Sequence, residues 1–185
     1  MKTDSPYKFA GIIPARYRSS RFPGKPLALI GSKPMIQLVY EQVAKSLKIV
    51  FVATDDKRIY DTVINFGGKA IMTSANHLSG TDRCAEAAAK IETETGIKID
   101  IVINIQGDEP FIKPEQIDLI MNCFQSEDIE IAKSTLERFN QGSLQTVTGA
   151  AGGVKYIPEC TKGTTKKFAT ENNINGENSF ASFIY

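Results

Sequence analysis

Short apolar runs alternate with segments of helical periodicity along this chain until about residue 132. The runs are short, and the first of them, 9–13, ends at the breaker Pro14, which is typical of a buried strand. The expected strands are 9–13, 49–53, 70–72, 99–105 and 129–132. Strands that alternate with helices pair in parallel, with helices on both faces of the sheet. The sequence therefore predicts an α/β fold with a Rossmann-like, doubly wound, mainly parallel sheet.

Four helices are expected between these strands. Pro34 suits the first helical position of one, and Thr54-Asp55 is expected to cap a second that Gly67-Gly68 ends. An Ala-rich helix is expected from about Asp82 to Glu94, and a last one begins near Pro114. Ligands of such sheets bind at the carboxyl ends of the strands, so the loops there are the first place to look for chemistry.

The loop after the first strand concentrates positive charge. Between Pro14 and Pro26 it carries two serines and four cations, which are Arg16, Arg18, Arg21 and Lys25. Arg offers a planar fork and Lys a compact charge, and together they suit a polyphosphate. The loop is neither a Walker A sequence nor Gly-x-Gly-x-x-Gly, which disfavours P-loop NTPases and dinucleotide oxidoreductases. From charge alone, a solvated basic loop remains the alternative.

Two further segments are candidates. Asp108, in a Gly-Asp turn after the most strand-like run, is a carboxylate that could hold Mg²⁺ against nucleotide phosphates, although an ordinary turn explains it as well. Residues 76–83 offer hydroxyls for a ribose or base, or simply an N-cap at Thr81 or Asp82. We interpret His77, the only histidine, as a structural or surface residue rather than a general base.

The composition of the chain excludes several classes of protein. The chain is 42% apolar and 23% charged with a net charge of +1, which fits a globular domain and argues against an electrostatic nucleic-acid partner. No apolar run is long enough to span a membrane, and we expect a cytoplasmic protein. Cys84, Cys123 and Cys160 form no Cys-x-x-Cys pair and are interpreted as bystander thiols.

Taken together, the motifs resemble those of the 3-deoxy-manno-octulosonate cytidylyltransferases (CMP-Kdo synthetases), over about residues 9–132. The matching segments are Ile-Ile-Pro-Ala-Arg-Tyr (12–17), Ser-Ser-Arg-Phe-Pro-Gly-Lys-Pro-Leu (19–27), Gly-Ser-Lys-Pro-Met-Ile (31–36), Val-Ala-Thr-Asp-Asp (52–56), His-x-Ser-Gly-Thr-Asp-Arg (77–83) and Gln-Gly-Asp-Glu-Pro (106–110). CMP-sialic acid synthetases share the Pro-Ala-Arg opening but not Gln-Gly-Asp-Glu-Pro.

The resemblance implies the fold of the nucleotide-diphospho-sugar transferases. It also implies transfer of a cytidylyl group from CTP to the acid sugar Kdo, with release of pyrophosphate, for lipopolysaccharide biosynthesis. Arg16, Lys25 and Asp108 would be the catalytic residues, with Asp108 the ligand of a Mg²⁺ cofactor. The nucleotide would lie against Ala15, Arg16, Ser19, Ser20, Lys25, Ser79, Gly80 and Gln106, with Arg21 and Arg83 as further candidate contacts.

Residues 133–185 depart from the family pattern. They are rich in Ser, Thr, Asn, Gln and Gly, show no sustained period, and lack the family's later Tyr-Phe-Ser-Arg and Asp-Thr-Pro-Glu-Asp segments. We therefore expect a nucleotide-binding half over 1–132 and an irregular polar tail over 133–185 that is disordered, frame-shifted or divergent. The family's homodimer is not expected to carry over. A non-catalytic nucleotide-binding remnant, or a cytidylyltransferase for another acid sugar, stays open as the alternative function.

Overall fold

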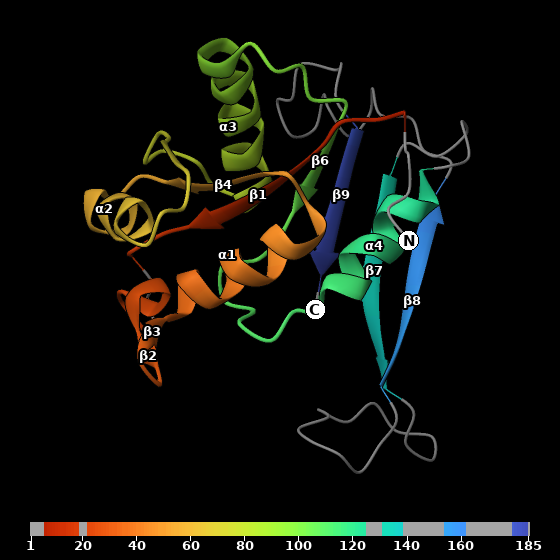
Figure 1. Cartoon of the computed structure of the whole chain (residues 1–185), viewed down its shortest axis with the longest axis horizontal. Coiled ribbons are helices and arrows are strands. Elements are labelled where there is room, and N and C mark those ends of the chain that lie inside the picture. Colours follow the sequence, from red (N-terminus) through yellow and green to blue (C-terminus); the bar gives the residue numbers. More distant parts are fainter. Residues whose placement is uncertain (1–5, 19–21, 125–130, 139–153, 162–178, 185) are drawn as a thin grey trace.

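The computed structural model describes residues 6–18, 22–124, 131–138, 154–161 and 179–184. Its main sheet has seven strands in the order β5-β4-β1-β6-β9-β7-β8. All pairs are parallel except β7 with β8. The strands are β1 (Phe9–Ala15), β4 (Ile49–Thr54), β5 (Ala70–Met72), β6 (Ile101–Asn104), β7 (Ile131–Arg138), β8 (Val154–Thr161) and β9 (Ser179–Ile184). The predicted α/β fold with a mainly parallel sheet is confirmed (Figure 1).

The four predicted helices are present among the described residues. They are α1 (Met35–Ser46), α2 (Lys57–Asn65), α3 (Gly80–Thr95) and α4 (Pro114–Cys123). The loop after β1 adds a 3-10 turn, η1 (Lys25–Leu27), and a small hairpin of β2 (Leu29–Ile30) and β3 (Lys33–Pro34).

Two predicted helix starts are wrong by one position. Pro34 is the N-cap of α1 rather than its first helical residue. Asp56, not Thr54-Asp55, caps α2, and its side chain accepts the backbone N–H of Arg58 at 3.0 Å. The Thr54 hydroxyl accepts the N–H of Asp56 at 3.2 Å instead, so it orders the turn before the helix. Because Asp56 is the cap, the Asp55 side chain is not used by α2 and lies at the carboxyl end of β4.

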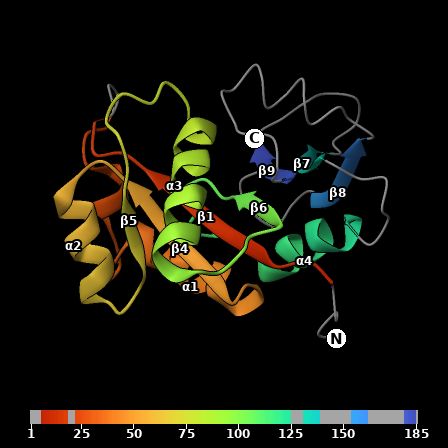
Figure 2. The same cartoon turned by 90° about the horizontal axis from the view of Figure 1, so that it is seen from above.

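The sheet separates two apolar layers. Helices α1, α2 and α4 bury one face of β1, β4 and β6, whereas α3 covers the other face with Cys84, Ala87, Ala88 and Ile91. Figure 2 shows α3 on the side of the sheet opposite to α1 and α4. Burial raises the pKa of the Cys84 thiol well above its usual range, which fits the bystander interpretation. The helices on both faces were expected from the alternation of elements.

Beyond residue 132 the structure differs from the expected irregular tail in three segments. Strand β9 pairs in parallel with both β6 and β7, and β8 pairs with β7, so all three strands belong to the main sheet. Strands β8 and β9 each contain an adjacent pair of aromatic and β-branched residues, Tyr156-Ile157 and Phe183-Ile184, which the polar composition of the whole segment conceals. The stretches 139–153 and 162–178 lie outside the described residues, and the division at residue 132 stays a prediction.

None of the helices in the described part of the chain is long and apolar enough to cross a membrane.

Candidate functional site

The carboxyl ends of β1, β4 and β6 lie side by side because these strands are parallel neighbours. Two glycines bring the loops beyond them close together. A Cβ on Gly107 would lie 2.9 Å from the carbonyl oxygen of Pro14, and one on Gly80 would lie 3.3 Å from the Pro14 ring. The loops after β1 and β6 and the start of α3 therefore meet at one end of β1. The three segments selected from the sequence form one region of the structure.

Lys25 and Asp108 form an ion pair across this region, although 83 residues separate them in sequence. The Lys25 ammonium donates to Oδ2 of Asp108 at 2.6 Å, and the two side chains are 38% and 50% exposed. Exposed pairs of this kind contribute little to stability because water competes for both charges. The contact therefore brings a cation and a carboxylate together on the surface, where an incoming ligand can reach both.

Lys25 owes its place to the way the loop after β1 folds back. Gly24 has a φ of 72°, which an L side chain rarely adopts, and its N–H donates to the Tyr17 carbonyl at 2.8 Å. The Tyr17 ring lies against the Arg58 guanidinium, 3.3 Å from the ring centre. The Asp56 carboxylate accepts two hydrogen bonds from that guanidinium, and this contact with Arg58 lowers the pKa of Asp56. A chain of contacts from α2 thus positions the start of η1.

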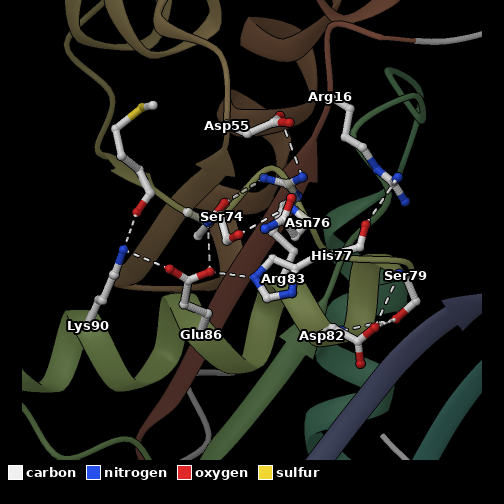
Figure 3. A network of polar contacts seen from close by, with 12 residues as sticks. Arg16, Asp55, Ser74, Asn76, His77, Ser79, Asp82, Arg83, Glu86 and Lys90 are labelled. Carbon is white, nitrogen blue, oxygen red and sulfur yellow. Dashed lines mark hydrogen bonds and ion pairs between the residues drawn. The ribbon is translucent and has the colours of Figure 1, made fainter. Parts of the chain in front are cut away.

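Arg16 lies at the other side of the loop and is exposed. Its guanidinium donates to the backbone carbonyl of His77 at 3.5 Å (Figure 3). It also donates to the backbone carbonyl of Leu78 at 3.3 Å. Both carbonyls belong to the segment that leads from β5 into α3. Arg16 is therefore oriented by this segment, and its charge is not neutralised by a carboxylate in the described contacts.

Ser79 is the N-cap of α3. Its hydroxyl accepts the N–H of Asp82 at 3.1 Å, and the Asp82 carboxylate accepts the N–H of Ser79 at 3.2 Å, which completes a capping box. The cap is therefore Ser79, and neither Thr81 nor Asp82, the two caps expected from sequence. The start of this 16-residue helix faces the end of β1, where a helix N-terminus favours negatively charged groups.

Arg83 is fully buried beneath the site. It donates to the Thr73 hydroxyl at 2.5 Å, and Nη2 lies 3.5 Å from Oδ1 of Asp55. Burial lowers the pKa of Arg83, and the charge of Asp55 opposes that shift. Because Arg83 has no exposed atoms, it joins the ends of β4 and β5 to α3 and does not reach a ligand. The resemblance had suggested a contact with the nucleotide.

Five further residues were predicted to lie at the site, and the structure describes two of them. Ala15 is buried at the end of β1, and Gln106 is half-buried in the loop after β6. Ser19, Ser20 and Arg21 lie outside the described residues. Among the described residues no group of three or more metal-binding side chains is present. Asp108 alone still fits Mg²⁺, which prefers oxygen ligands and is usually held by one or two carboxylates together with substrate phosphates.

Gly107 lies so close to β1 that a larger residue there is expected to destabilise the fold. Gly107→Ala should lower the free energy of unfolding by about 1–3 kcal/mol, because the added methyl group meets a backbone oxygen that cannot move aside. Gly80→Ala is the control: its methyl group meets only the Pro14 side chain, and we expect a change within about 1 kcal/mol. Urea denaturation of both variants measures the difference. Equal stability of Gly107→Ala and the unmodified chain would contradict the packing described here.

Several residues that shape the site were not selected from the sequence. Arg58 supports Tyr17, and Glu86 on α3 contacts both Ser74 and His77. The only sequence signal for Glu86 is Lys90 four residues later, which indicates a helix surface pair and nothing more. His77 is half-buried and paired with Glu86, which agrees with its interpretation as a structural residue.

Comparison with known proteins supports the family resemblance. A family model described as cytidylyltransferase matches residues 10–173. A 3-deoxy-manno-octulosonate cytidylyltransferase of Bacteroides thetaiotaomicron is 58% identical over 125 residues, which cover 68% of this chain and 48% of the relative. An 8-amino-3,8-dideoxy-manno-octulosonate cytidylyltransferase of Shewanella sediminis is 52% identical over 128 residues, covering 68% and 51%. The chain spans about half the length of the curated relatives it matches.

Solved structures of cytidylyltransferases are also similar to this chain. A structure of CMP:2-keto-3-deoxy-manno-octonic acid synthetase complexed with CTP is 43% identical with a TM-score of 0.61, over 69% of this chain and 53% of the other. A cytidylyltransferase of Leptospira borgpetersenii is 26% identical with a TM-score of 0.57, over 69% and 53%.

Proposed function

This chain belongs to the cytidylyltransferase family, and we propose that it carries the nucleotide-binding part of an enzyme that makes CMP-Kdo. The reaction transfers a cytidylyl group from CTP to 3-deoxy-manno-octulosonate and releases pyrophosphate, and its product would serve lipopolysaccharide assembly. The observation that carries the proposal is that Arg16 and the Lys25–Asp108 pair lie on loops that come together at the end of β1. These are the groups that a triphosphate and its metal need.

The triphosphate would lie between the loop after β1 and the start of α3. Two backbone carbonyls already orient the Arg16 guanidinium, so its side chain loses less conformational entropy when the triphosphate binds. Lys25 would exchange the Asp108 carboxylate for a phosphate oxygen. Because the Lys25–Asp108 pair is half exposed, breaking it costs little.

The chemical step needs no covalent intermediate with the protein. A sugar hydroxyl oxygen forms a bond to the α-phosphorus and gives up its proton to solvent, while the bond from that phosphorus to the α–β bridging oxygen of CTP breaks, so that this oxygen leaves as a terminal oxygen of pyrophosphate. Negative charge grows on the departing pyrophosphate, and Arg16 and Lys25 would stabilise it by positions set before reaction. With Lys25 on the phosphates, the Asp108 carboxylate would be the group that holds Mg²⁺, and the ion would supply positive charge to the phosphate oxygens.

A second acid sugar is a specific alternative. Relatives named 8-amino-3,8-dideoxy-manno-octulosonate cytidylyltransferase match almost as well as those named for Kdo, at 52–53% against 56–60% identity. The shared part would be the nucleotide-binding part on this proposal, and it supports CTP as the donor for either acceptor. A nucleotide-binding protein without turnover is the remaining alternative.

Pyrophosphate release distinguishes these functions. The full chain is incubated with CTP, Mg²⁺ and either Kdo or its 8-amino analogue, with Asp108→Ala as the comparison. We expect release with Kdo, lowered by about a hundredfold or more in Asp108→Ala. Release with the 8-amino sugar alone would favour that acceptor. Saturable CTP binding without release would favour the non-catalytic alternative and contradict the proposed activity of this chain.

A further inference from the structure

Glu86 lies on α3, one helix turn beyond Arg83, and its carboxylate faces the segment 73–79 that leads into the helix (Figure 3). Its Oε2 accepts the backbone N–H of Ser74 at 2.8 Å and also contacts Nε2 of His77. Its Oε1 pairs with the Lys90 ammonium at 2.7 Å. The same ammonium donates to the Met72 carbonyl at 2.8 Å, so the pair ties both β5 and the segment after it to the helix.

The segment is held at three places. Arg83 fixes its beginning through the Thr73 hydroxyl, and the Ser79 cap fixes its end. Residues 74–77 lie between these points and are exposed or half-buried, without a core contact of their own. Among the described contacts, Glu86 is the group that joins this middle part to α3.

The carbonyls that orient Arg16 sit directly after the part that Glu86 holds. Arg16 donates to the His77 and Leu78 carbonyls, and His77 is the residue whose ring Glu86 contacts. A displacement of His77 therefore moves an acceptor of the Arg16 guanidinium. Long side chains such as Arg lose rotamer freedom when a ligand immobilises them, and earlier orientation reduces that loss.

Glu86 itself is committed to protein groups. Burial works against its charge, but the hydrogen bonds from Lys90, Ser74 and His77 prevail and lower the pKa of Glu86 to about 2. The carboxylate is therefore ionised at neutral pH, and its contacts are lost only as the pH falls through that value. Because these contacts occupy the Glu86 carboxylate, we expect it to hold the segment 73–79 and not to bind a ligand.

We propose that Glu86 is a positioning residue of the nucleotide site: it holds residues 74–77 against α3 so that the backbone carbonyls of His77 and Leu78 keep the Arg16 guanidinium oriented toward the triphosphate. The inference rests on the proposed CTP-binding function. It adds to that function a residue outside the strand-end loops, linked to the ligand only through Arg16.

A double-mutant cycle tests the link. The dissociation constant for CTP with Mg²⁺ is measured by titration calorimetry on the full chain, on Glu86→Ala, on Arg16→Ala and on the double variant. We expect Glu86→Ala to weaken binding about three- to tenfold when Arg16 is present, and less than about twofold when it is absent. A merely structural role of Glu86 would weaken binding by the same factor in both backgrounds and would overturn the proposal.

Glu92 on the same helix supplies the matched control. Its carboxylate also accepts a backbone N–H, from Ile99 at 2.7 Å, but at the far end of α3. Glu92→Ala should leave CTP affinity within about twofold of the unmodified chain. A loss as large as that of Glu86→Ala would contradict the proposal, because it would assign the effect to the helix as a whole.

Two results need separate interpretation. If Glu86→Ala does not fold, Glu86→Gln replaces it in the cycle, since the amide keeps the size of the side chain and removes its charge. Equal effects of Glu86→Gln with and without Arg16 then overturn the proposal. If the folded, unmodified chain does not bind CTP, the proposed function fails and this inference fails with it, whereas binding without coupling removes the inference alone.

Discussion

Lys25→Ala is expected to weaken CTP binding about ten- to hundredfold, while the free energy of unfolding changes by less than about 1 kcal/mol. The first effect follows from the loss of a charged hydrogen bond to phosphate, which contributes about 1.5–3 kcal/mol. The second follows from the exposure of the Lys25–Asp108 pair, because half-exposed pairs contribute at most about 1 kcal/mol to stability. Calorimetric titration and urea denaturation measure the two quantities on the same preparation.

Lys33→Ala is the matched control for this prediction. Lys33 pairs with Glu41 at 2.7 Å, and the two side chains are 44% and 40% exposed, which resembles the Lys25–Asp108 pair in length and exposure. We expect the same small change in stability and a CTP affinity within about twofold of the unmodified chain. Equal losses of affinity in both variants, or none in Lys25→Ala, would contradict the assignment of Lys25 to the triphosphate.

Arg83→Met should destabilise the fold by about 3 kcal/mol. The substitution keeps much of the buried volume but leaves the Asp55 carboxylate, which is 18% exposed, without its positive partner. It also removes the hydrogen bond to the buried Thr73 hydroxyl. Breaking a buried pair by removing one member is among the costliest single changes because the remaining charge stays in a poorly solvated place.

Urea denaturation measures this loss, with Lys57→Ala as the control. Lys57 pairs with Asp61 on the surface of α2 and is 81% exposed, so its removal should change stability by less than about 0.5 kcal/mol. An Arg83→Met variant as stable as Lys57→Ala would mean that Arg83 does not join β4, β5 and α3 in the way described.

Local patterns were sufficient to predict the elements around the site. The apolar runs became β1, β4, β5 and β6, and the helices began within two residues of the positions expected. One error lies where several residues could cap a helix. Thr54, Asp55 and Asp56 can each do so, but Asp56 caps α2 in the structure and the Thr54 hydroxyl accepts the N–H of Asp56. Ser79 was selected for a nucleotide contact, and its capping of α3 was not foreseen.

Contacts between distant segments could not be read from the chain. The Lys25–Asp108 pair depends on the order of strands in the sheet, and the Glu86 contacts depend on the path of residues 73–79 over α3. The expected strand 129–132 covers only the start of β7, and strands β8 and β9 were not predicted. Strand β9 pairs with β6 across about 75 residues, and no local period indicates it. Sequence spacing places a motif at a strand end, whereas packing decides which motifs meet.

We expect CTP to bind at the end of β1, between the loop that carries Lys25 and the start of α3. Backbone amide chemical shifts of the full chain, followed by NMR during titration with CTP and Mg²⁺, test this most directly. Saturable shifts are expected at residues 15–18, 24–25, 77–80 and 106–108, and they should be lost in Lys25→Ala at the same CTP concentration. Shifts centred on another surface of the folded chain, or no shifts at saturating CTP, would contradict it.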